Sequence, residues 1–324
     1  MKTANWRWLA TGLVVLQACV GAGLGSSQAA ATTHLKLPLT GTLFYHRYSS
    51  YKAWNATLWS LNLKNGHLVQ VGANWKKVIS PINAQVSATG RLMTFMASAS
   101  GLASPEWDVF TSRWDGKTWL EPTNLTGPNG KRDEDPKFSP DGQEIIYKEN
   151  GVLVVMSSGG ATKKYLTKGE PESSMPYFRA DGKGILFERG GDILLWNKGS
   201  TVAMNPGKGV SSYYPIGVDA KRFLYTRTQS TRHDWIYWGF YDGSVSQPLF
   251  FNSNSWDSSD PYPYQDGKSF IFLVSGDYSI LKGGYNLMVA DLAKAKNYNI
   301  DDLYGTVNSD LEELGPSWTK FMYN

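Results

Sequence analysis

Hydrophobic and polar positions alternate in short runs along most of this chain. A run typically follows a proline and a tight turn such as Asp-Gly, and a second alternating run comes a few residues later, as in EDPKFSPDGQEIIYKENG from Glu134. Alternation with a period of two predicts half-buried β-strands, and the turn residues predict hairpins between them. The pattern therefore predicts an all-β chain of short antiparallel strands.

Four segments repeat this pattern most clearly, and their opening prolines lie 40, 39 and 46 residues apart. These prolines are Pro136, Pro176, Pro215 and Pro261. A repeat of this length built from short strands is typical of a β-propeller. A degenerate copy starts at Ile82, and the copy from Leu314 stops after one strand. Three strands without an opener, from Gly41, Thr57 and His67, supply what that last copy lacks. We expect six blades of four antiparallel strands, the first closed by strands from both termini.

The segment from Pro136 to Tyr147, PKFSPDGQEIIY, resembles the repeat of the TolB-type six-bladed propellers, which reads approximately P-x-F-S-P-D-G-x-x-I-x-F. The copies at Pro176 and Pro261 match it in part, and the resemblance extends over residues 41–324 as a single propeller. It implies an exported bacterial protein that acts as a binding scaffold in the cell envelope. Propellers also host enzymes, so any activity must be argued from a site.

Residues 1–30 are predicted to be a signal peptide followed by a short tether. Lys2 and Arg7 precede an apolar run that is short for a membrane span. Small residues up to Ala31 suit an ordinary signal peptidase, which would leave a periplasmic or secreted protein. The sequence LQAC ending at Cys19 instead resembles a bacterial lipobox, so lipidation of Cys19 and anchoring in the envelope is the second route. Cys19 is the only cysteine, which excludes an intrachain disulfide framework.

The charge of the chain excludes one class of partner. The formal net charge is +4, from 32 basic and 28 acidic residues, and no basic stripe is present. We therefore expect no nucleic-acid partner. An envelope protein or a polysaccharide is the expected partner, and contact with a membrane is expected only through the possible lipid.

Aromatic residues gather in the loops that the repeat geometry places on one face. These are the loops from the second to the third strand of a blade and the loops that enter the next blade. The predicted ligand-binding residues are Trp54, Trp75, Trp107, Trp256, Tyr48, Tyr51 and Tyr213. Flat rings cover the apolar faces of sugars or side chains at low entropic cost. The alternative is that these rings pack loops onto neighbouring blades.

Acidic residues on the same face leave the question of catalysis open. Asp135 and Asp260 both stand directly before a repeat proline, and repetition at equivalent sites favours a turn or cap role. Paired carboxylates can hydrolyse glycosidic bonds, but the sequence gives no separation and assigns no catalytic residue. His34, His46, His67 and His233 show no ligand spacing, so no metal or cofactor is expected.

Two functions therefore remain. The first is a non-enzymatic binding scaffold of the envelope whose aromatic face holds a protein segment or a glycan. The alternative is a polysaccharide-active enzyme, either a glycoside hydrolase or a lyase, that uses acids on the same face.

Overall fold

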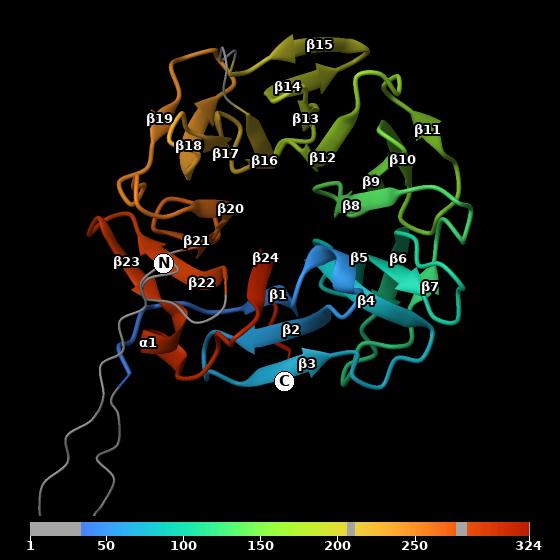
Figure 1. Cartoon of the computed structure of the whole chain (residues 1–324), viewed down its shortest axis with the longest axis horizontal. Coiled ribbons are helices and arrows are strands. Elements are labelled where there is room, and N and C mark those ends of the chain that lie inside the picture. Colours follow the sequence, from blue (N-terminus) through green and yellow to red (C-terminus); the bar gives the residue numbers. More distant parts are fainter. Residues whose placement is uncertain (1–33, 206–210, 277–283, 324) are drawn as a thin grey trace, which may run out of the picture. The chain divides into compact units, whose positions relative to one another are not determined.

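The computed structural model describes residues 34–205, 211–276 and 284–323. These residues form six four-stranded antiparallel sheets arranged in a ring, which is a six-bladed β-propeller (Figure 1). The fold predicted from the repeats is confirmed. The predicted leader, including Cys19, lies outside the described residues. Within the described ranges, no helix has the length and apolar character needed to cross a membrane.

Each blade contributes one innermost strand beside the central channel. From blade 1 to blade 6 these are β24 (Glu312–Thr319), β4 (Val78–Val86), β8 (Asp133–Phe138), β12 (Ser173–Phe178), β16 (Ser212–Gly217) and β20 (Ser258–Pro263). The second strands are β1 (Thr42–Tyr48), β5 (Leu92–Ala99), β9 (Glu144–Glu149), β13 (Ile185–Arg189), β17 (Arg222–Thr228) and β21 (Phe270–Ser275).

The outer half of each blade contains its third and fourth strands. The third strands are β2 (Thr57–Asn62), β6 (Asp108–Arg113), β10 (Val152–Ser157), β14 (Asp192–Asn197), β18 (Asp234–Phe240) and β22 (Asn286–Asp291). The outermost strands are β3 (Leu68–Val71), β7 (Thr123–Asn124), β11 (Lys164–Tyr165), β15 (Ser200–Ala203), β19 (Gln247–Pro248) and β23 (Lys296–Asn299). A 3₁₀ turn, η1 (Tyr51–Ala53), and one short helix, α1 (Ile300–Tyr304), complete the described elements.

Blade 1 is closed by strands from opposite ends of the sequence. β24 pairs antiparallel with β1, and Thr319 lies opposite Thr42 in the register. In Figure 1 the red strand β24 therefore lies beside the blue strand β1. The strands expected from Gly41, Thr57 and His67 are β1, β2 and β3, so the closure predicted from the sequence is confirmed.

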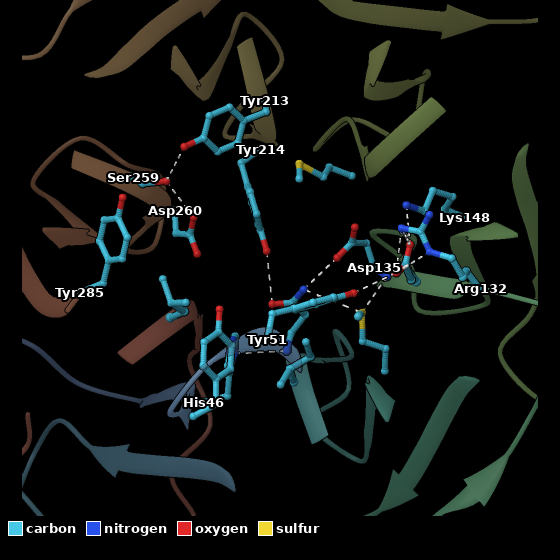
Figure 2. A pocket seen from close by; sticks show the side chains of 17 residues that line it. His46, Tyr51, Arg132, Asp135, Lys148, Tyr213, Tyr214, Ser259, Asp260 and Tyr285 are labelled. Atoms are coloured by element: carbon cyan, nitrogen blue, oxygen red, sulfur yellow. Dashed lines mark hydrogen bonds and ion pairs between the residues drawn. The ribbon is translucent and has the colours of Figure 1, made fainter. Parts of the chain in front are cut away.

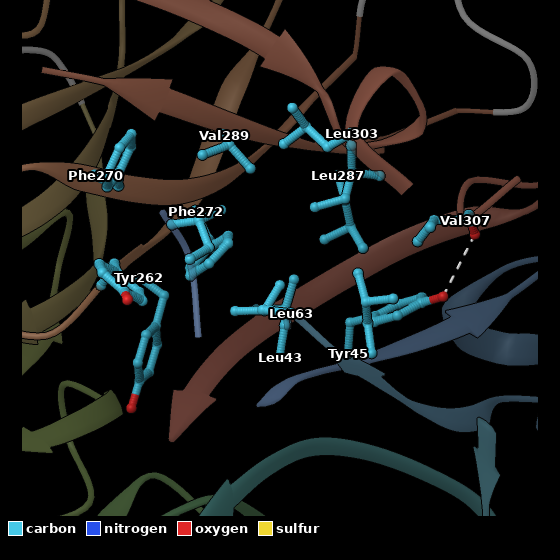
Figure 3. Packing of buried hydrophobic residues seen from close by; sticks show 14 of the residues in the cluster. Leu43, Tyr45, Leu63, Tyr262, Phe270, Phe272, Leu287, Val289, Leu303 and Val307 are labelled. Carbon is cyan, nitrogen blue, oxygen red and sulfur yellow. Dashed lines mark hydrogen bonds between the residues drawn. The ribbon is translucent and has the colours of Figure 1, made fainter. Parts of the chain in front are cut away.

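The blades pack face to face through the alternating side chains of their middle strands. On β21, Phe270 and Phe272 belong to a cluster with Leu43 of blade 1 (Figure 3), whereas Ile271 and Leu273 belong to the cluster shared with blade 5. Each of these strands is thus buried on both faces, which explains its nearly continuous apolar sequence. Full burial of one such side chain contributes about 1.5–3 kcal/mol.

A bulge recurs in every innermost strand and prepares the functional site. The residue at the bulge has a left-handed backbone: Asn83 (φ 55°), Asp135 (55°), Met175 (52°), Tyr214 (52°), Asp260 (46°) and Gly315 (60°). A proline follows this residue in five blades, and Ala84 takes its place in blade 2. The strand register shifts at the same points. Because a bulge bends the strand and re-aims side chains, these positions can turn toward the channel.

Candidate functional site

Five of the six bulge residues line a cavity of about 370 Å³ at one mouth of the central channel, which we call the mouth pocket (Figure 2). The starts of the innermost strands and the loops next to them form its walls. It opens on the face predicted to carry the binding loops, where the second strand of each blade connects to the third. Its volume lies within the range of small-ligand sites, which is about 300–1,000 Å³.

Hydrogen bonds across the channel close the mouth pocket from below. The hydroxyl of Tyr214 in blade 5 donates to Oδ1 of Asn83 in blade 2, at 3.2 Å. One layer deeper, Nε2 of Gln85 donates to the hydroxyl of Tyr177 at 3.1 Å, and that hydroxyl donates to the hydroxyl of Tyr262 at 3.4 Å. These side chains come from blades on different sides of the ring. The mouth pocket is therefore blind, and it suits the end of a ligand rather than a chain that passes through.

Two carboxylates in the mouth pocket have no basic partner among the residues that the structure describes. Asp135 accepts a hydrogen bond from Nδ2 of Asn83 at 2.8 Å, and Asp260 accepts from Oγ of Ser259 at 2.9 Å and from the backbone N–H of Gly315 at 3.1 Å. Among the described residues neither carboxylate has an ion pair. Burial raises the pKa of both groups, that of Asp260 to about 6. The site therefore holds two acids whose charge is costly to bury.

Lys137 provides only a distant counter-charge. It follows Asp135 by two residues on β8 and lines the small cavities deeper in the channel. Its Nζ donates to the carbonyl of Pro136 at 3.2 Å, and it forms no ion pair with either aspartate. Burial lowers its pKa, while Asp135 and Asp260 act in the opposite direction. Lys137 thus lies deeper in the channel than Asp135 and Asp260 and forms no direct ion pair with either carboxylate.

The basic residues on the pocket wall are already paired. Glu134, which is buried, forms ion pairs with Arg132 at 2.9 Å and with Lys148. Lys148 also pairs with Glu172 at 2.8 Å. The hydroxyl of Tyr51 donates to Oε1 of the same Glu134 at 2.9 Å. This cluster is self-contained, unlike the pair of aspartates.

His46 lines the mouth pocket behind the bulge of blade 1. Gly315 leaves room for it, since a Cβ at that position would lie 2.9 Å from the imidazole ring. The side chain is 3% exposed, and burial lowers its pKa to about 3, so the ring is neutral. Its Nδ1 accepts from the backbone N–H of Asn83 at 3.5 Å, which assigns the proton to Nε2. Within the described residues this Nε2–H has no hydrogen-bond partner.

A loop from blade 1, residues 49–56, forms a strap over one side of the mouth pocket. It contains η1, and the rings of Tyr51 and Trp54 lie 5.2 Å and 4.2 Å from the ring of Trp107 in blade 2. The hydroxyl of Tyr51 donates a hydrogen bond to Glu134 in blade 3. The strap thus bridges three neighbouring blades, and its two rings pack in a tilted arrangement against Trp107, which is 5% exposed.

The structure brings the predicted tyrosines together but not the predicted tryptophans. Tyr48, Tyr51 and Tyr213 all line the mouth pocket. Trp54 of the strap packs against Trp107 of blade 2 with tilted rings, as the packing alternative describes. That either tryptophan also binds a ligand stays a prediction.

The other two tryptophans lie apart from the mouth pocket. Trp75 stacks on Phe95 at 5.3 Å, and its Nε1 donates to the carbonyl of Trp119 at 3.1 Å. It therefore packs with the cluster shared by blades 1 and 2. Trp256 is half-buried in the segment before β20 and is not among the residues that line the pocket.

Sequence reasoning missed the residues at the centre of the site. The sequence predicts a turn or cap role for Asp135 and Asp260. Both residues stand at the bulge that recurs in the blades, and Asp260 accepts from the backbone N–H of Gly315, but their side chains also line the pocket, which the sequence did not indicate. Tyr214 and Asn83 occupy the equivalent bulge position in their blades. The position of these residues in the sequence, directly before the proline of each innermost strand or before Ala84 in blade 2, could have identified them as residues that line the pocket. Among the described residues, no group of three or more His, Cys, Asp or Glu could hold a metal ion.

Comparisons with known proteins identify the fold. No family model and no curated protein matches this sequence. The structure of TolB from Acinetobacter baumannii is similar with a TM-score of 0.64 and 16% identity, over 86% of this chain and 66% of that chain. Hydrazine synthase from Kuenenia stuttgartiensis is similar with a TM-score of 0.67 and 11% identity, over 88% of this chain and 48% of that chain. Oligogalacturonate lyase from Vibrio parahaemolyticus is similar with a TM-score of 0.54 and 13% identity, over 79% of this chain and 78% of that chain. The chain thus spans less than two thirds of the TolB and hydrazine synthase chains, and the likeness shows a shared fold.

Proposed function

We propose that this propeller with a TolB-like fold is a non-enzymatic binding scaffold of the cell envelope, which holds a protein segment or a glycan at the mouth pocket. The observation that carries the proposal is the blind pocket itself, with an aromatic wall and a floor of cross-channel hydrogen bonds. A concave site with a few converging polar groups is the usual form of a binding site.

The polar groups around the mouth pocket are arranged to hold each other in place. Ser259 donates its hydrogen bond to Asp260 and is not paired with a histidine base. Asp234 accepts from the hydroxyls of Tyr213 at 2.7 Å and Thr228 at 2.7 Å. An activated nucleophile needs an adjacent base, and these contacts do not provide one. The arrangement supports binding better than chemistry.

The proposed location follows from the leader and from the TolB resemblance. We propose that the chain is exported and is either periplasmic or anchored in the envelope through a lipid on Cys19. Its partner is then an envelope protein or a polysaccharide. Tyr48, Tyr51 and Tyr213 supply ring faces to this partner, and an extended ligand would reach Trp54, Trp75 or Trp256 outside the pocket, whereas Trp107 supports the strap from within.

One observation favours the alternative of a polysaccharide-active enzyme. The pKa of Asp260 is raised to about 6, and a general acid must keep its proton close to neutral pH. A similar structure is that of an oligogalacturonate lyase. If the alternative holds, incubation with uronate-containing polysaccharides yields new reducing or unsaturated ends, and Asp260→Asn abolishes them.

Site-specific photo-crosslinking tests the binding proposal. A photoreactive residue is placed at Tyr51, on the strap, and for comparison at Met322, which is 52% exposed near the end of the chain. We expect a discrete envelope adduct from position 51 and none from position 322. Equal adducts from both positions, or adducts from position 322 alone, would contradict binding at the mouth pocket. Failure of all polysaccharide cleavage assays would leave the enzyme alternative without support.

A further inference from the structure

We infer that the mouth pocket recognises a primary ammonium group carried by a peptide, either the N-terminus or the tip of a lysine side chain. This inference rests on the proposed binding function and specifies the ligand of the same site. It follows from three features of the pocket: two acids without an ion-pair partner among the described residues, an imidazole N–H on the pocket wall, and the aromatic side chains around them.

The acids supply the site for a cation. Asp135 and Asp260 enter the pocket from blades 3 and 6 and lie on different sides of it in Figure 2. Buried charges in proteins are normally paired, yet in the described structure neither carboxylate has a basic partner within ion-pair distance. A ligand cation between them would provide the missing partner, and an ammonium has three N–H donors to share.

An imidazole N–H of the pocket wall favours a ligand that also carries an acceptor. His46 is 3% exposed, its ring is held by the N–H of Asn83, and its Nε2–H lacks a partner among the described residues. Because His46 lines the pocket, a ligand oxygen can accept from this N–H. A peptide carbonyl close to an ammonium group meets both needs. A neutral glycan would satisfy His46 but would leave the two carboxylates without a counter-charge.

The walls and floor favour an organic cation of limited length. The rings of Tyr48, Tyr213 and Tyr214 line the pocket, and aromatic faces attract desolvated cations. The bond between Tyr214 and Asn83 closes the floor, and the amine of Lys137 lies below it. A cation cannot move deeper without approaching that amine. No set of three or more ligating His, Cys, Asp or Glu side chains occurs in the described part of the chain, which disfavours a metal ion.

Calorimetric titration of the full chain with matched peptides tests the inference. The probes are the amidated peptide Gly-Ala-Tyr with a free N-terminus, the same peptide acetylated, and acetylated Gly-Lys-Tyr amide. We expect the free N-terminus or the lysine peptide to bind at least about tenfold more tightly than the acetylated Gly-Ala-Tyr peptide, because charge-assisted hydrogen bonds are about twice as strong as neutral ones. Comparison of the first and third probes distinguishes the two sources of the ammonium.

Paired variants assign the effect to the pocket. Asp135→Asn and Asp260→Asn, singly and together, should weaken binding of the charged probe by about tenfold or more and leave the acetylated probe unchanged. Glu144→Gln is the matched control, since Glu144 is an exposed carboxylate at the other end of blade 3. Circular dichroism of each variant verifies that it is folded.

Three results would overturn the inference: equal affinity for charged and acetylated peptides, unchanged affinity in the folded double variant, or no binding of any probe at millimolar concentration. The photo-crosslinking experiment with position 51 decides the scaffold proposal independently, because it needs no assumption about the charge of the partner.

Discussion

The cost of burying Asp260 without a basic partner leads to a prediction about stability and pH. Asp260→Asn is the suitable perturbation, since asparagine also tolerates the left-handed backbone found here, with φ 46°. The pKa of Asp260 rises from an ordinary 3.8 to about 6 in the folded chain, and burial is the main cause. The folded state therefore binds the proton more tightly than the unfolded state does. The wild-type chain loses stability as the pH rises from about 4 to about 6, and the asparagine variant lacks this loss.

The size of the effect follows from the same pKa. The difference between 3.8 and about 6 corresponds to about 3 kcal/mol in the free energy of unfolding. Asparagine keeps one acceptor oxygen for Gly315 N–H and loses the hydrogen bond from Ser259, which costs about 1 kcal/mol. At pH 7.5 the variant should therefore be more stable than the wild type by about 2 kcal/mol. At pH 4 the cost of the charge in the wild type falls to about 0.5 kcal/mol, so the variant should be less stable by about 0.5 kcal/mol.

Urea unfolding of both chains at pH 4, 5, 6 and 7.5 measures this difference. Asp266→Asn, an exposed acid paired with Lys268, is the control and should show no such crossover. A wild type that stays more stable than Asp260→Asn at every pH would refute the reasoning. It would mean that Lys137 or another group compensates the charge of Asp260 in the folded state.

Further variants test the packing that supports the site. Phe272→Ala, at a fully buried position, should lower the free energy of unfolding in urea by about 3–5 kcal/mol. The exposed control Val245→Ala should change it by no more than about 0.5 kcal/mol, and similar losses for both variants would contradict the assigned core. Trp107→Ala should release the strap and therefore accelerate tryptic cleavage after Lys52, which mass spectrometry detects. An unchanged cleavage rate would mean that the ring contacts with Trp107 do not hold the loop. Tyr177→Phe removes the hydroxyl that bonds to Gln85 and Tyr262 across the channel and should lower the free energy of unfolding in urea by about 1–3 kcal/mol. Unchanged stability would mean that these cross-channel hydrogen bonds do not stabilise the fold.

The architecture was predictable because each blade repeats local signals. The proline, the turn and the apolar run of each copy specify one hairpin, and the period counts the blades. The missing opener at Gly41 and the single strand from Leu314 even predicted the closure of blade 1. These signals act within about twenty residues, so a sequence carries them without knowledge of distant contacts.

The site was predictable only in part, because it depends on contacts between blades. The face and Tyr48, Tyr51 and Tyr213 followed from loop positions. The inward direction of Asp135 depends on a bulge, and a shift of one residue reverses which side a strand residue faces. The contact between the rings of Trp54 and Trp107 joins residues of different blades, and the burial of His46 depends on a glycine far away in the sequence.

The most direct test of the central claim is a titration combined with product analysis. The full chain is titrated with the amidated Gly-Ala-Tyr peptide that has a free N-terminus and with the acetylated Gly-Lys-Tyr amide, and mass spectrometry then examines each probe after overnight incubation. The account predicts saturable one-site binding that depends on Asp135 and Asp260, with the probe recovered intact. Cleavage of the probe, or equal binding by the Asp135→Asn/Asp260→Asn variant, would contradict a mouth pocket that binds a terminal ammonium without chemistry.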